Sequence, residues 1–138
     1  MKIKNLVNEL IKKYETRDPF ILAKAKGIRI CKENLGNLYG YSSTYKREMS
    51  IHINSNYSEE IQKLVCAHEL AYLLMYPKET CHIVFDLSTS NNPNFEKYIK
   101  LFMSHLLVSD YILEKYNGEN IDECESITLA LVTSKTNY

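Results

Sequence analysis

Two adjacent side chains, His68 and Glu69, have the types and the setting that best suit catalytic chemistry in this chain. They are the only strongly polar side chains in residues 64–76. In a His-Glu-x-x-His helix, two imidazoles one turn apart reach one metal ion, and the glutamate takes a proton from metal-bound water. Here the position four residues after His68 is Tyr72. By themselves these residues are more typical of a hydrogen-bonded core histidine than of a metal site.

The elements that must position this pair follow from apolar spacing. Helical spacing predicts helices over residues 2–14, 19–26, 58–76, 95–108, 111–116 and 120–132, with Asp18 and Ser58 as N-caps. Alternation predicts strands over residues 28–31, 38–45 and 49–54, and residues 81–87 form a short strand or an extended loop. Strands close in sequence favour an antiparallel meander. We therefore expect an α+β fold, with a small antiparallel sheet packed against the central helix and flanking N- and C-terminal helices.

The composition indicates one globular domain. The chain has 138 residues, 45% of them hydrophobic, and its 17 Lys and Arg residues balance 17 Asp and Glu residues. We expect a single domain over residues 1–138, with an N-terminal helix over residues 1–14 and a frayed tail over residues 133–138. The zero net charge argues against a nucleic-acid binder driven by phosphate neutralisation, although a local basic patch stays open. The charged N-terminus is a poor signal peptide, and we expect a cytoplasmic protein with reduced cysteines and no membrane partner.

A longer stretch, from Tyr14 to about Leu113, resembles the ImmA/IrrE family of metallopeptidases. The resemblance is carried by Arg17-Asp18-Pro19-Phe20-Ile21-Leu22-Ala23, Gly27-Ile28, Leu35-Gly36-Asn37-Leu38-Tyr39-Gly40-Tyr41, Ile53-Asn54, Cys66-Ala67-His68-Glu69-Leu70, Pro77 and Leu106-Leu107. It implies a zincin-like fold. It also implies a protein of a prophage or other mobile element, in a family that cleaves or antagonises phage-type repressors.

The departures from the family pattern concern the metal site. The family has His-Glu-Leu-Gly-His on the central helix and a glutamate on a later helix. Tyr72 stands at the second histidine, and counting back from Leu106-Leu107 puts Tyr98 at the glutamate. On this count only His68 of three expected zinc ligands remains. The resemblance thus predicts a degenerate, metal-free polar cluster of His68, Glu69, Tyr72 and Tyr98, without a cofactor.

Two functions follow from this resemblance and stay open. In the first, the chain is a non-catalytic family member, a pseudoenzyme, that binds a protein partner such as a phage-type repressor. Tyr39, Tyr41 and Tyr76 are its candidate contact residues.

In the second, the chain is an active metallo-endopeptidase with a remodelled zinc site that cleaves a repressor. Glu69 is then the general base and His68 one ligand, and the candidate substitute ligands are Cys81, His82 and His105. The missing ligands favour the first function, because a carboxylate without a metal cannot activate water near neutral pH.

Overall fold

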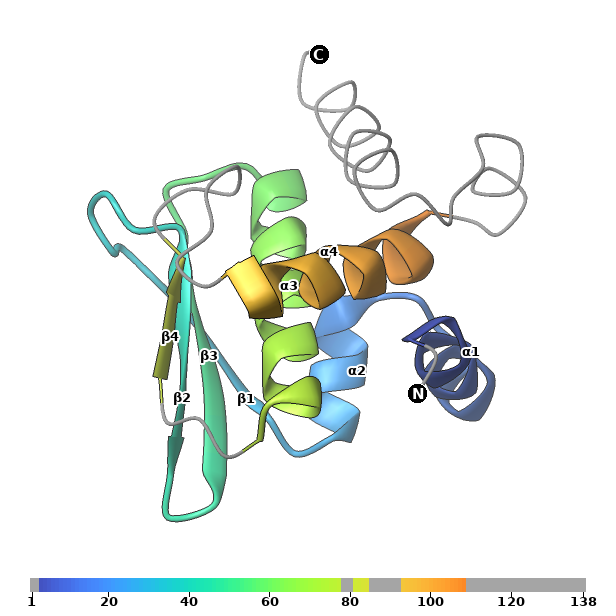
Figure 1. Ribbon diagram of the computed structural model, residues 1–138. Coiled ribbons are helices and arrows are strands. Elements are labelled where there is room, and N and C mark those ends of the chain that lie inside the picture. Colours follow the sequence, from blue (N-terminus) through green and yellow to red (C-terminus); the bar gives the residue numbers. More distant parts are fainter. Residues whose placement is uncertain (1–2, 78–80, 85–92, 109–138) are drawn as a thin grey trace.

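The computed structural model describes residues 3–77, 81–84 and 93–108 (Figure 1). Its elements are α1 (Ile3–Tyr14), α2 (Pro19–Ala25), β1 (Arg29–Glu33), β2 (Gly40–Tyr45), β3 (Glu48–Asn54), α3 (Glu59–Met75), β4 (Cys81–Val84) and α4 (Pro93–Leu107). The expected α+β class is confirmed. The helices predicted over residues 111–116 and 120–132, and the tail over residues 133–138, lie outside the described residues. No described helix has both the length and the apolar character that a membrane span requires.

The sheet has the strand order β1-β3-β2-β4, and one of its pairings differs from the predicted meander. β2 pairs antiparallel with both β3 and β4, but β1 pairs parallel with β3. β1 and β2 do run in opposite directions, yet β3 lies between them. Their connection therefore crosses the end of β3, where the Asn54 side-chain amide donates to the carbonyl oxygens of Gly36 and Leu38 at 2.9 and 2.7 Å. These bonds fix the loop between β1 and β2 as it crosses the end of β3. A simple hairpin between neighbouring strands has no such crossing loop.

α3 is the central helix, and the sheet packs on one side of it (Figure 1). Ser58 begins α3 by accepting a hydrogen bond from the Ile61 backbone N–H, as its sequence position predicts. Gly40 of β2 lies against this helix. A Cβ atom at Gly40 would be 2.6 Å from the His52 carbonyl oxygen and 2.7 Å from Cγ1 of Val65. Glycine at this position therefore lets the sheet approach α3 closely.

α4 crosses α3 and is held at its C-terminal end by the N-terminal part of the chain (Figure 1). The Arg17 guanidinium donates to the backbone carbonyls of His105 and Leu106 at 2.9 and 3.2 Å. Both carbonyls belong to the last turn of α4, so Arg17 caps the C-terminal end of this helix. The apolar face of α1 also packs on α4. These contacts fix the direction of α4 and so determine what its first turn brings to α3.

We predict that Gly40→Ala destabilises the fold by about 1–3 kcal/mol, because the added methyl group overpacks the contact between β2 and α3. Urea unfolding followed by circular dichroism measures this loss. Because one of the two clashing atoms belongs to Val65, the double variant G40A/V65A should cost less than the sum of its single variants. An unfolding free energy of G40A within about 0.5 kcal/mol of the wild type would contradict the close packing.

Candidate functional site

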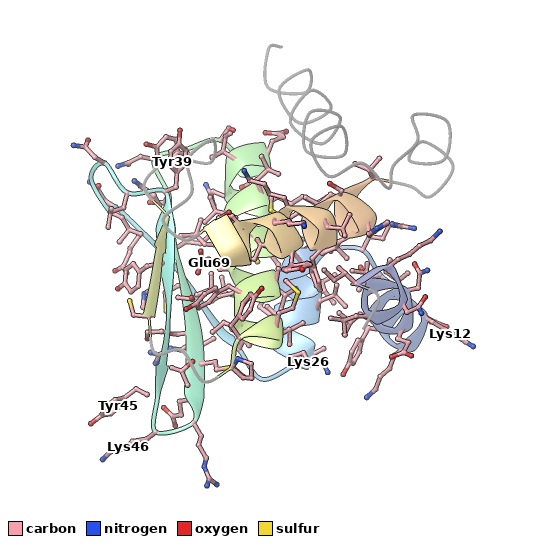
Figure 2. All side chains as sticks on the ribbon, in the orientation of Figure 1. Lys12, Lys26, Tyr39, Tyr45, Lys46 and Glu69 are labelled. Atoms are coloured by element: carbon pink, nitrogen blue, oxygen red, sulfur yellow. The ribbon has the colours of Figure 1, made fainter. Side chains whose placement is uncertain are left out.

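The central turn of α3 carries His68 and Glu69 into the interior. Every residue from Leu64 to Leu73 is buried, because this part of the helix meets the sheet on one side and other helices on the other. Only 5% of His68 is exposed, and Glu69 is fully buried. Figure 2 shows Glu69 between the sheet and the helices. Two ionisable groups at such depth need hydrogen-bonding partners inside the protein.

His68 has a carboxylate at each of its two ring nitrogens. Nδ1 lies 3.1 Å from Oε1 of Glu69, and Nε2 lies 3.0 Å from Oε2 of Glu96 and 3.2 Å from Oε1 of Glu96. Glu96 belongs to the first turn of α4 and is 5% exposed. A neutral imidazole has one N–H, whereas an imidazolium has two. The geometry therefore suits a protonated His68 that donates to both carboxylates.

Two opposing effects set the pKa of His68. Burial alone lowers it, because desolvation disfavours the charged ring. The hydrogen bonds and charges of Glu69 and Glu96 act in the opposite direction and outweigh burial, so the pKa of His68 is raised above its ordinary value. We refer to His68, Glu69 and Glu96 together as the imidazolium cluster.

Sequence reasoning missed Glu96 and placed Tyr98 opposite His68. In the structure Glu96 takes that place, and Tyr98 is 44% exposed. One stripe of buried residues on α4 consists of Glu96, Ile99, Phe102, Met103 and Leu106, and Ser104 and His105 are buried on other sides of the helix. The spacing of Glu96 from Ile99 and Met103 was the signal that could have found it, because a carboxylate on the apolar stripe of a helix must point inward.

Tyrosines border the imidazolium cluster at the C-terminal end of α3. Tyr72, one turn after His68, is 3% exposed, and its ring is tilted against that of Tyr76 with 5.8 Å between centroids. Burial raises the pKa of Tyr76, and so does Tyr98 nearby. Tyr72 therefore occupies the predicted interior position, whereas Tyr98 lies near Tyr76 at a more exposed place.

Of the candidate substitute ligands, Cys81 and His105 form no metal-binding group with His68 in the described part of the structure. Cys81 is an exposed free thiol at the start of β4, opposite Ser43 of β2. His105 is buried, but it follows Glu96 by nine positions. This spacing places it ~13 Å further along α4 and on the opposite side of the helix. The side chain of His82 lies outside the described part of the structure. Among the described residues, no group of three or more His, Cys, Asp and Glu side chains could hold a metal ion.

The candidate contact tyrosines lie at the start of β2 and at the C-terminal end of α3. Tyr39 stacks on Tyr57 with 4.4 Å between ring centroids, just before β2 and α3 begin. Tyr41 stacks on the His52 ring at 4.3 Å and belongs to the sheet face that points away from α3. Tyr76 borders the imidazolium cluster. The role of these three residues in partner contact stays a prediction.

The donor set of the described residues does not complete a zinc centre. Catalytic zinc sites use three protein ligands, usually His, Asp, Glu or Cys. Nε2 of His68 and the carboxylate of Glu96 are two suitable donors. The next interior position along α3 holds the phenol of Tyr72, whose ordinary pKa is near 10 and which is a rare zinc ligand.

We predict that His68 makes stability depend on pH in the neutral to alkaline range. Its folded-state pKa is raised above the unfolded value, so its contribution is complete below about pH 6.5 and is lost as the pH rises through the folded-state pKa. The slope cannot exceed about 1.4 kcal/mol per pH unit, because one proton is involved. Urea unfolding between pH 6 and 9, with NMR titration of the imidazole, measures both quantities.

The matched variant is Glu96→Gln, which keeps a hydrogen-bond acceptor but removes one charge. It should lower the pKa of His68 and move the loss of stability to lower pH. A wild-type His68 that titrates below its ordinary pKa, or a titration that Glu96→Gln leaves unchanged, would contradict the proposed imidazolium.

Comparison with known proteins places this scaffold in a family. The chain matches the peptidase M78 family model, described as the IrrE N-terminal-like domain, over residues 23–131. It is 30% identical to "Uncharacterized immunity region protein 2" of Bacillus phage phi105 over 117 residues, which cover 84% of this chain and 74% of that protein. It is 29% identical to "Metallopeptidase ImmA" of Bacillus subtilis (strain 168) over 115 residues, 82% of this chain and 67% of that protein. No solved structure matches the chain significantly. The expected membership is confirmed: the chain belongs to the ImmA/IrrE-like family of metallopeptidases.

Proposed function

We propose that this family member comes from a phage or mobile element and binds a protein partner, such as a phage-type repressor, without hydrolysing it. One observation carries the proposal. Both ring nitrogens of His68 have a carboxylate partner within the imidazolium cluster, and the next interior position of α3 holds a buried tyrosine where the family has its second histidine. Similarity to a phage immunity-region protein supports the kind of partner.

The chemistry of the cluster supports a non-catalytic role. A metal ion would have to displace the proton on Nε2 of His68, because only an unprotonated imidazole nitrogen binds a metal. Only two donors of the described residues would then hold the ion where three or four are usual, so the gain in binding from them would be small. The carboxylates of Glu69 and Glu96 instead stabilise the charged ring. The cluster thus fits a structural role inside a scaffold whose outer surface contacts the partner.

A second function has a specific observation in its favour. Glu96 places a carboxylate beside the ring nitrogen that would bind zinc, and Glu69 stands where the family has its general base. An active metallo-endopeptidase would then need a third ligand from residues outside the described part. This alternative differs from the first in its requirement for a stoichiometric metal ion.

Zinc binding separates the two functions. We predict that the purified wild-type chain takes up no stoichiometric zinc in competition with a fluorescent chelator at neutral pH. Tyr72→His adds the missing imidazole one turn from His68 and should increase zinc affinity by roughly 100-fold or more. Adding Glu96→Gln to that variant should remove the gain.

Tyr76→His is the matched control, since it adds a histidine at the C-cap of α3, ~12 Å from His68. Its zinc affinity should stay at the wild-type level. One equivalent of zinc in the wild type would favour the peptidase. A Tyr72→His variant without a gain would mean that zinc does not use the His68–Glu96 pair.

Mixing with a phage-type repressor tests the partner itself. We predict that size-exclusion chromatography gives a complex in which the repressor remains intact, as judged by mass spectrometry. Glu69→Gln should not change this outcome, because the proposal assigns no catalysis to Glu69. Repressor cleavage that Glu69→Gln abolishes would establish the peptidase alternative. The absence of any complex and any cleavage would contradict both functions for that repressor.

A further inference from the structure

The balanced net charge of the chain hides a strong separation of charge along it. Residues 1–32 contain nine Lys and Arg residues and three Asp and Glu residues, whereas residues 33–138 contain eight and fourteen. The first segment comprises α1, α2 and most of β1, which pack next to one another. An excess of positive charge in neighbouring elements produces a local potential that the net charge does not reveal.

The converging C-terminal ends of α1 and α2 carry most of this excess. Five exposed cations define what we call the basic surface: Lys12, Lys13, Lys24, Lys26 and Arg29. Two of them meet on one ring, since Nζ of Lys13 and Nζ of Lys26 lie 5.3 and 5.9 Å from the centroid of Tyr14. Figure 2 shows Lys12 and Lys26 on the part of the molecule formed by α1 and α2, away from the tip of the β2–β3 hairpin.

The cations of the basic surface are not neutralised by described carboxylates. None of the five forms an ion pair with an Asp or Glu side chain in the described part of the chain. Glu9 and Glu15 are exposed acidic residues of the same segment. Their two negative charges do not balance the five positive charges of the basic surface. Lysines near a helix C-terminus interact favourably with the helix dipole, but this interaction stabilises the helix by at most about 1 kcal/mol for each lysine. Helix stabilisation also gives no reason for two helix ends to bring their lysines together.

We propose that the basic surface binds the phosphate backbone of double-stranded DNA without reading its sequence. Four of its five cations are lysines, which contact phosphates as point charges. Lysine is depleted at protein–protein interfaces, where aromatic residues and arginine supply the affinity, so an acidic protein is a poorer fit. Stable attachment to a membrane surface usually combines basic residues with several apolar anchors, and Ile21 is the one large aliphatic residue exposed among the described residues.

The binding of a fluorescein-labelled 20-base-pair duplex of random sequence, followed by anisotropy, tests this proposal. If the surface contacts three to five phosphates, the logarithm of the affinity should fall against the logarithm of salt concentration with a slope of about −2.7 to −4.5. The double variant K13Q/K26Q should lower the affinity about tenfold at low salt and reduce the slope by about 2. Circular dichroism confirms that the variant is folded.

The matched control is K46Q/K97Q, which removes the same charge from outside the basic surface. Lys46 and Lys97 are also exposed lysines that lie over tyrosine rings, at 5.4 and 5.6 Å, so the double variant loses the same type of contact. Its DNA affinity should change by less than about twofold. An equal loss in both double variants would overturn the proposal, because net charge alone would then explain binding.

Two further probes separate DNA from other anionic partners. Vesicles of phosphatidylcholine and phosphatidylglycerol at 3:1, and polyglutamate at the same charge concentration as the duplex, should compete for the protein at least about tenfold more weakly. Equal competition by vesicles would reassign the basic surface to membranes, and equal competition by polyglutamate would reassign it to acidic proteins. No binding of the duplex at 50 mM salt would overturn the proposal outright. None of these outcomes depends on zinc or on the repressor.

Discussion

The charged hydrogen bonds between His68 and two carboxylates are the constraint to which the rest of the interior conforms. A buried imidazolium is unfavourable unless both of its N–H groups have acceptors, and a buried carboxylate is unfavourable without a donor. The cluster meets these needs only if Glu69 on α3 and Glu96 on α4 lie on either side of the ring. The crossing of the two helices is therefore coupled to the charge state of one histidine.

The N-terminal segment supports this arrangement from a distance. Arg17 caps α4 through the carbonyls of His105 and Leu106, and α1 packs along the same helix. On the other side of α3, Gly40 allows the sheet to approach closely. The first turn of α4, which carries Glu96, is thus positioned by contacts at the opposite end of the helix. Substitutions at Arg17 and Gly40 would therefore affect the cluster without touching it.

The side chains of the imidazolium cluster are compatible both with a metal site of the family type and with a metal-free interior. The residue at position 72 decides between the two, and in this chain it is a tyrosine. A histidine at this position would add a third nitrogen donor on the same side of α3. A phenol instead fills the space with an apolar ring and one hydroxyl group. The proposed non-catalytic function follows from that difference in donor chemistry. The proposed DNA contact uses other elements and concerns charge at the surface.

The sequence by itself determined the local structure of this protein. Capping side chains, glycines and apolar periodicity predicted the described helices, three strands and the position of His68 and Glu69, because these signals act between residues close along the chain. Only the tertiary structure decided the parallel pairing of β1 with β3 and the residue that faces His68. Counting from a motif placed Tyr98 there, but a shift of two residues rotates a helix by about 200°, and the packing of α4 turned Glu96 inward. Contacts between segments distant in sequence set that rotation.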